Sequence, residues 1–208
     1  QAWQISSVEE VNSKDKVKFH SRVFSVLSAL LTCATSFLLI ILQPLYRILT
    51  EKSYYIGWTA TPFLLFAMVF SCYSNFLGTN YVAMKKTTGI FLTTVGGAVI
   101  NIILNILLTR PFGIIGTAFA TAVGFFITWG ARVFGTRRFV RIHYPLRTFI
   151  VPTVLLLAQT VLLSVGINSI WIQCIFFAVI VLLYIDIIVM CCKKGIVFAK
   201  SILNRKKA

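Results

Sequence analysis

The sequence predicts an all-α integral membrane protein with six transmembrane helices, and two observations lead to this prediction. Hydrophobic residues make up 58% of the 208 residues and charged residues only 12%, with a mean hydropathy of +0.89. Soluble globular domains are about half apolar and a quarter charged. In addition, apolar runs of about 20 residues, the length that crosses a bilayer as a helix, alternate with short polar segments.

The elements follow in order from this alternation. Residues 1–21 form a polar, basic segment that we expect in the cytoplasm, and residues 193–208 form a basic tail expected on the cytoplasmic membrane surface. The membrane domain between them, 22–192, has predicted spans at about 22–42, 54–73, 89–109, 113–134, 148–165 and 170–192. Pro62 lacks a backbone donor and is expected to kink the second span.

Basic residues indicate the topology. The polar segments on one side of the predicted spans hold 17 of the 20 Lys and Arg residues, with Arg132 counted in the loop after the fourth span. The opposite segments hold three, namely Arg47, Lys52 and Arg110. The positive-inside rule therefore places both termini of this multi-pass chain in the cytoplasm. The net charge of +15 is thus explained by topology and by contact with membrane lipids, without nucleic acid as a partner.

The third and fourth spans form a predicted hairpin with a three-residue hinge, Arg110-Pro111-Phe112. Small or polar residues recur every four positions in both runs: Gly89, Thr93, Gly97, Asn101 and Asn105, then Gly116, Ala120, Gly124 and Thr128. Small residues at this spacing allow helices to approach closely in lipid. Carboxamides in a membrane need a partner or a water-filled cavity. We therefore expect a tightly packed hairpin with one polar face.

Two interpretations stay open for the polar residues of the hairpin. Asn101 and Asn105 either line a substrate pathway, where they would bind sugar or pyrophosphate groups, or form hydrogen bonds between helices. Arg110 either attracts an anionic substrate or extends to lipid headgroups.

Outside the hairpin, the kinked second span ends in three polar residues, Asn75, Asn80 and Tyr81. They either line a substrate pathway or are solvated residues of the membrane interface. Asp186 is the one carboxylate inside an apolar run. It is a candidate for proton or cation coupling, or it pairs with the basic interface near Lys193.

Catalysis is not indicated. The five cysteines lie within or at the ends of apolar runs, and none is spaced from a histidine as zinc ligands are. His20 and His143 both lie in basic polar segments. We therefore expect no enzyme activity, no catalytic residues, no bound metal and no cofactor. Because the chain begins with Gln1 and shows no signal-peptide pattern, we expect a piece of a longer protein.

The hairpin carries a motif that resembles a known family. The motif residues are Asn101, Asn105, Leu108, Phe112, Gly113, Gly116, Thr117, Ala118, Ala120 and Thr121. Two further segments belong to the same pattern, namely Ala2-Trp3-Gln4-Ile5-Ser6 and Asn80-Tyr81 before Lys85-Lys86. Together these residues resemble the C-terminal portion of polysaccharide flippases, which are Wzx-type exporters of O-antigen and other lipid-linked oligosaccharides. These flippases belong to the multidrug/oligosaccharidyl-lipid/polysaccharide exporter superfamily. The resemblance covers most of residues 1–135; residues 136–208 match only in hydropathy.

This resemblance implies a function. The six spans would correspond to helices nine to fourteen of a two-lobe transporter with twelve to fourteen helices, and the missing N-terminal lobe would be a partner. The whole would export lipid-linked saccharide units across the bacterial inner membrane by alternating access. Alternatives are a multidrug/cation antiporter or peptidoglycan-precursor flippase of the same superfamily, a non-transporting membrane scaffold, and a membrane-embedded acyl- or glycosyltransferase.

Overall fold

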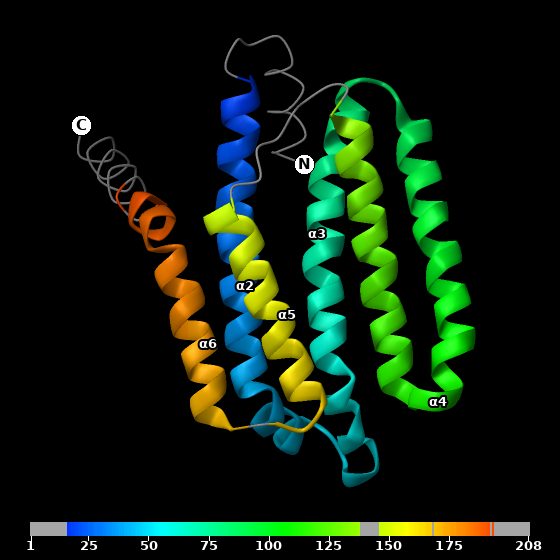
Figure 1. The fold of residues 1–208 in the computed structure, drawn as a ribbon, viewed down its shortest axis with the longest axis vertical. Helices are drawn as coiled ribbons and strands as arrows, with labels where there is room; N and C mark the ends of the chain where they lie inside the picture. Colours follow the sequence, from blue (N-terminus) through cyan, green and yellow to red (C-terminus); the bar gives the residue numbers. More distant parts are fainter. Residues whose placement is uncertain (1–15, 138–145, 168, 192, 194–208) are drawn as a thin grey trace, which may run out of the picture.

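The computed structural model describes residues 16–137, 146–167, 169–191 and 193, and this part of the chain contains helices and no strand (Figure 1). The helices are α2 (Lys16–Leu49), η2 (a 3₁₀-helix, Lys52–Thr59), α3 (Thr61–Ala83), α4 (Thr87–Thr136), η3 (a π-helix, Leu146–Ile150), α5 (Val151–Ser164) and α6 (Ile170–Leu183). A further short helix, Ile185–Cys191, continues α6 at an angle of 62°. Residues 1–15 of the predicted segment 1–21 and residues 194–208 of the predicted tail 193–208 lie outside the described residues.

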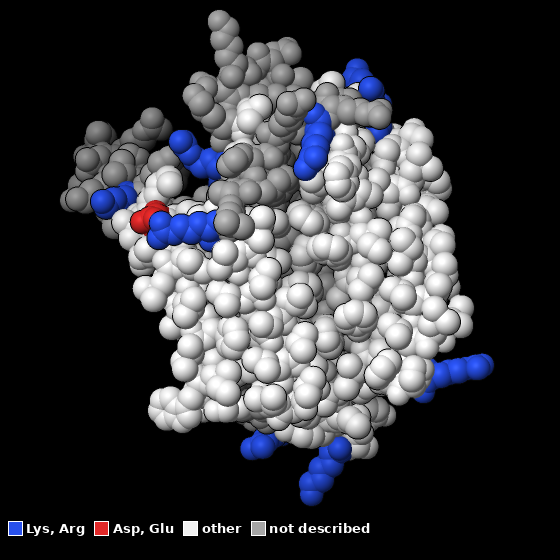
Figure 2. Space-filling model, viewed as in Figure 1, with Lys and Arg blue, Asp and Glu red and all other residues white. Residues whose placement is uncertain are grey.

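The helices have the length and composition of membrane spans. Within the described residues four helices qualify, namely Phe19–Leu49, Thr61–Ala83, Thr87–Thr136 and Arg147–Ser164, and α6 with its bent continuation is a possible fifth. On the face shown in Figure 2, the described Lys and Arg side chains lie toward the two ends of the molecule, and the surface between them is uncharged. These are the features of a helical membrane protein, as the sequence predicts.

Helix α4 is a hairpin. A straight helix of its 50 residues would be about 75 Å long, more than twice the hydrocarbon thickness of a bilayer. Instead the chain reverses at Gly113, whose φ of 55° and ψ of −134° are not helical, and residues 87–112 (the first leg) run antiparallel to residues 114–136 (the second leg) (Figure 1). The reversal lies one residue beyond the predicted hinge because positive φ is accessible to glycine but not to Pro111.

The core is aromatic and joins α2, α3 and α5. Phe24 of α2, Tyr73 of α3 and Phe149 of η3 contact one another with ring centroids 5.2–5.5 Å apart. Phe70 extends this cluster to the second leg of α4 through Trp129, at 5.3 Å. The second leg therefore packs on α3, whereas the first leg lies at the edge of the bundle (Figure 1).

Hydroxyl and amide groups link α2 to three other helices. Ser28 Oγ forms hydrogen bonds with the hydroxyls of Tyr73 (2.9 Å) and Tyr184 (3.0 Å). Ser36 Oγ donates to Gln159 Oε1 at 2.7 Å, and Gln159 Nε2 donates to the Ser36 carbonyl at 3.2 Å. These buried polar side chains are paired with one another, as burial in an apolar bundle requires.

The helix limits differ from the predicted spans. The predicted second span at 54–73 is wrong in its limits, because residues 52–59 form η2 and α3 runs from Thr61 to Ala83. Helix α2 begins before residue 22 and continues through Pro44 to Leu49. The predicted kink at Pro62 is wrong, because Pro62 lies in the first turn of α3. A backbone N–H at that position has no acceptor within the helix, so that its absence in proline breaks no helical hydrogen bond. The predicted continuous span at 170–192 is broken at Tyr184, whose hydroxyl is held by α2.

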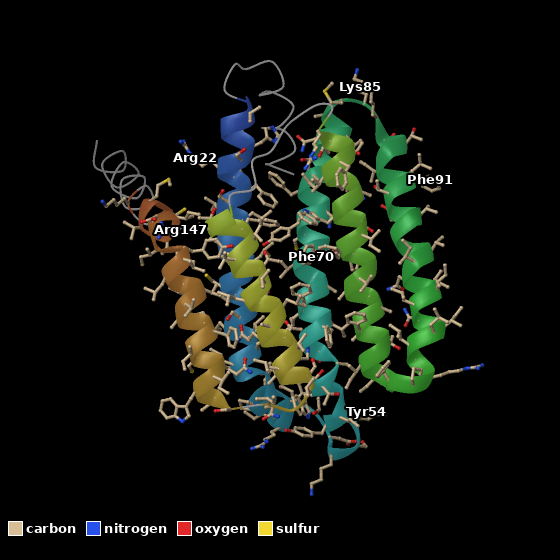
Figure 3. All side chains as sticks on the ribbon, in the orientation of Figure 1. Arg22, Tyr54, Phe70, Lys85, Phe91 and Arg147 are labelled. Carbon is tan, nitrogen blue, oxygen red and sulfur yellow. The ribbon has the colours of Figure 1, made fainter. Side chains whose placement is uncertain are left out.

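The ends of the helices group as the charge pattern predicts. Arg22, Lys85 and Arg147 lie at one end of the bundle, and Tyr54 lies at the other (Figure 3). The reversal of α4 lies at the same end as η2 (Figure 1).

Candidate functional site: a polar groove beside Arg132

A cavity of about 330 Å³ lies between α3 and the two legs of α4, and we refer to it as the α3–α4 groove. Its lining comprises Ser71, Ser74 and Asn75 of α3, Thr94, Gly97, Ala98 and Asn101 of the first leg, and Thr121, Gly124, Phe125, Thr128 and Arg132 of the second leg. Most of these side chains are small or polar, although the helices that carry them are apolar overall. The groove therefore carries several polar side chains inside a membrane-type bundle, although most of its lining surface is apolar.

Glycines bring the two legs of α4 together along this groove. A Cβ atom on Gly97 would lie 2.9 Å from the carbonyl oxygen of Gly124 and would also collide with Thr128. A Cβ atom on Gly124 would lie 2.9 Å from Cβ of Asn101. The close packing predicted from the four-residue spacing is confirmed at these positions, and Asn101 is held against the second leg.

Arg132 is the one charged residue of the groove, and only 4% of its surface is exposed. Its Nη1 donates to the Ser74 carbonyl at 2.7 Å, its Nη2 to Thr94 Oγ1 at 2.8 Å, and its Nε to Thr93 Oγ1 at 3.1 Å. All three acceptors are neutral, and no carboxylate in the described ranges pairs with the guanidinium. Of the five N–H donors of an arginine, two have no hydrogen bond to the described part of the chain.

The sequence interpretation of Arg132 was wrong, because it counted this residue among the charges of the following loop. The structure places it inside α4, facing α3 and the first leg. A signal for this position exists in the sequence: Arg132 follows Thr128 by four residues and so continues the series from Gly116. A cation on the packed face of a membrane helix is a candidate functional residue.

The groove brings together two of the predicted site residues, Asn75 and Asn101. Asn105 does not line it. Asn105 Nδ2 instead donates to the carbonyl oxygen and to Oδ1 of Asn101, both at 3.0 Å, so that its bonds stay within the first leg and do not link two helices.

The other predicted residues lie elsewhere. Arg110 is exposed beside the reversal of α4. Asn80 is buried without lining the groove, and its Nδ2 has no hydrogen-bond partner among the described residues. Tyr81 lines a second cavity, of about 570 Å³, together with Lys85. Asp186 is exposed on the short helix beyond α6, and α6 and the α4 hairpin occupy opposite sides of the bundle (Figure 1).

The side chains of the groove can form hydrogen bonds to a ligand. It offers hydroxyl and amide groups and one guanidinium, and no group of three or more His, Cys, Asp or Glu side chains that could hold a metal occurs within the described residues. No protein-family model, curated protein or solved structure matches the chain. The resemblance to flippases rests on the sequence motifs alone.

Proposed function

We propose that the chain belongs to a transporter that moves lipid-linked saccharide units across the bacterial inner membrane by alternating access, and that the α3–α4 groove lines the path. The observation that supports this most strongly is the buried Arg132 in a polar groove without a paired carboxylate. A saccharide linked to lipid through a diphosphate presents anionic oxygens and hydroxyls. The free N–H donors of Arg132 suit the phosphate oxygens, and Asn75, Asn101 and the threonine hydroxyls suit the sugar.

The same proposal includes the architecture. The two legs of α4 count as separate spans, and α6 with its bent continuation counts as one, which gives six spans with both termini in the cytoplasm. The groove is open, since Asn75 and Thr94 are exposed in it. In the whole transporter the missing N-terminal lobe would cover this opening and complete a central cavity.

The charge of the groove distinguishes the proposed function from the other transport functions of the same superfamily. A multidrug/cation antiporter needs an acidic residue beside its pathway, and the groove is lined by none. Asp186 remains a coupling candidate only if it acts from the other side of the bundle. A peptidoglycan-precursor flippase would use the same diphosphate chemistry and is the closest alternative.

A non-transporting scaffold is the second candidate, and one observation favours it. Three donors of Arg132 already bond to oxygens of the same chain, and Asn105 bonds to Asn101, as expected for residues that only hold helices together. The experiment below separates the two functions.

The test is cysteine accessibility in the intact protein in its native membrane, after replacement of the five native cysteines. Single cysteines replace Asn75 and Asn101, which line the groove. A cysteine at Ile102 is the control, because the Ile102 side chain is 58% exposed on the surface of the helix but does not line the groove. With a charged thiol reagent, we expect labelling at Asn75 and Asn101 that lipid-linked oligosaccharide prevents, and none at Ile102. Absence of labelling at both groove positions in every condition would favour the scaffold.

A transport assay provides the second arm. In vesicles, Arg132→Gln is expected to reduce export of lipid-linked oligosaccharide by roughly tenfold or more, since a charge-assisted hydrogen bond to phosphate contributes about 1.5–3 kcal/mol. Arg147→Gln removes the same charge from an exposed site away from the groove and is expected to leave export unchanged. Equal activity of the two variants would contradict an anion-binding role for Arg132.

A further inference from the structure

Two adjacent helices carry buried polar side chains without hydrogen-bond partners. In α6, the Gln173 side chain is only 2% exposed, and neither its Nε2 nor its Oε1 has a partner within the described ranges. In α5, the same holds for the hydroxyl of Ser164, which is 8% exposed. Ser164 ends α5 and Gln173 lies in the first turn of α6, and these two helix ends meet at the end of the bundle where η2 lies (Figure 1). An unpaired buried amide or hydroxyl raises the free energy of the state that buries it, because water would satisfy the same atoms.

The opposite end of α6 is well attached to α2. Tyr184 is fully buried, and its hydroxyl lies 3.0 Å from Ser28 Oγ. Ile180, Tyr184 and Ile187 pack with Ala29 of α2 in one apolar cluster. The chain bends there by 62° into the next short helix. Tyr184 is therefore a firmly held position at which the direction of the helix already changes.

Residues 170–177 of α6, which we refer to as the arm, have little contact with the bundle. Gln173 is the one buried residue among them. The ring of Phe177 contacts Phe37 of α2, with centroids 6.0 Å apart, but the Phe37 side chain is itself 49% exposed. Three apolar side chains of the arm are 60–78% exposed, namely Ile170, Trp171 and Ile175. Little apolar packing therefore keeps the arm against α2 and α5.

We propose that the arm swings about Tyr184 between the closed position of the structure and an open position. The open position brings the Gln173 side chain to water at the membrane interface, which the exposed cations Arg47 and Lys52 mark at this end of the bundle. Opening loses a small apolar contact, and it provides hydrogen bonds for the amide and uncovers the Ser164 hydroxyl. These two effects offset each other, as two interconverting states require.

This inference is independent of the transport proposal, because α6 and the α4 hairpin occupy opposite sides of the bundle (Figure 1). The same arrangement suits a distance measurement by pulsed electron paramagnetic resonance on the full chain in lipid nanodiscs, after replacement of the five native cysteines. One spin label replaces Ile106 in the first leg of α4. The second replaces either Ile175 of the arm or Leu182 beside Tyr184, and all three side chains are more than 60% exposed. We expect two distances for the Ile106–Ile175 pair and one for the Ile106–Leu182 pair.

The test variant is Gln173→Met, which keeps an unbranched side chain of similar size and removes the unpaired amide. It is expected to lower the ratio of open to closed arm by roughly tenfold, or about 1.4 kcal/mol, which lies within the cost of one unpaired buried group. The matched control is Gln159→Met. Gln159 is equally buried, but both ends of its amide bond to Ser36, so the control should leave the ratio within about twofold of the wild type.

Reaction of a cysteine at position 164 provides a second measurement, without spin labels. A charged thiol reagent reaches Ser164→Cys only when the arm is open, so adding Gln173→Met should slow this reaction by roughly tenfold. Three results would overturn the proposal. These are a single distance for the Ile106–Ile175 pair in the wild type, a reaction rate at position 164 that does not depend on Gln173, and equal shifts of the ratio in Gln173→Met and Gln159→Met.

Discussion

Arg132 Nη1 donates to the main-chain carbonyl of Ser74 at 2.7 Å, and this bond joins the second leg of α4 to α3. The two threonines that accept the other bonds of Arg132 also donate their own hydroxyls to carbonyl oxygens of the first leg, at 2.8–3.0 Å. The Ser74 carbonyl lies within α3, where the helix supplies another donor. Arg132 is thus well bonded, but removing it leaves none of these groups without a partner.

Replacing Arg132 by methionine is therefore expected to change the free energy of unfolding by less than about 1 kcal/mol, since the lost hydrogen bonds are offset by relief from burying a charge. Unfolding in a denaturing-detergent titration measures this quantity. A loss of several kcal/mol would show that Arg132 is chiefly structural. An unchanged stability with lost export would identify it as a residue kept for binding.

Gly97→Ala is expected to destabilise the protein by about 1–3 kcal/mol, because its methyl group would collide with the second leg. The neighbouring Gly96→Ala is the control. Its Cβ meets nothing within 4 Å, and alanine stabilises a helix interior by roughly 0.5–1 kcal/mol relative to glycine. The difference in unfolding free energy between these adjacent variants measures the closeness of the hairpin. Equal effects would mean that the two legs do not pack as described.

Gly113→Ala is expected to destabilise the hairpin by about 1–2 kcal/mol. The reason is backbone strain alone, since φ is 55° and nothing lies within 4 Å of an added Cβ. Gly130→Ala, also without a near neighbour but in helical conformation, should be neutral or stabilising. Thermal unfolding of the two variants in the same detergent tests this. A tolerated alanine at Gly113 would place the reversal elsewhere.

Tyr184→Phe removes the hydroxyl that Ser28 contacts at 3.0 Å, where α6 breaks. We expect a loss of about 0.6–1 kcal/mol, as for other hydrogen bonds between membrane helices. Tyr54→Phe is the control, because Tyr54 is 71% exposed. Hydrogen exchange at residues 185–191 should rise in Tyr184→Phe only. An unchanged exchange rate would show that the bend does not depend on this bond.

The features that follow from repeated local patterns could be predicted from the sequence. Apolar runs predict the long helices, and the four-residue series through Gly97 and Gly124 predicts the contact between the two legs. Asn101 was recognised as a candidate because a carboxamide in a membrane needs a partner or a water-filled cavity. Asn75 was singled out because it ends a span that was expected to be kinked at Pro62, and that kink is wrong.

The features that depend on tertiary contacts could not be predicted in this way. The break in α6 has no proline or glycine to mark it, and Tyr184 finds its partner Ser28 more than 150 positions away. Pro62 was misinterpreted because the 3₁₀-helix before α3 has no distinctive pattern. Arg132 was missed because basic residues near the end of an apolar run are usually topological signals.

The order of residues in α4 also bears on how the protein enters the membrane during synthesis. Thr93 and Thr94 leave the ribosome nearly forty residues before Arg132, on a leg that already lies beside the place that Arg132 will take. The arginine can therefore move into the bilayer as part of a closed hairpin. Two of its hydrogen-bond acceptors then already lie on the first leg, and the third is the Ser74 carbonyl of the preceding helix. Insertion of the hairpin as one unit avoids the expense of exposing a lone guanidinium to lipid.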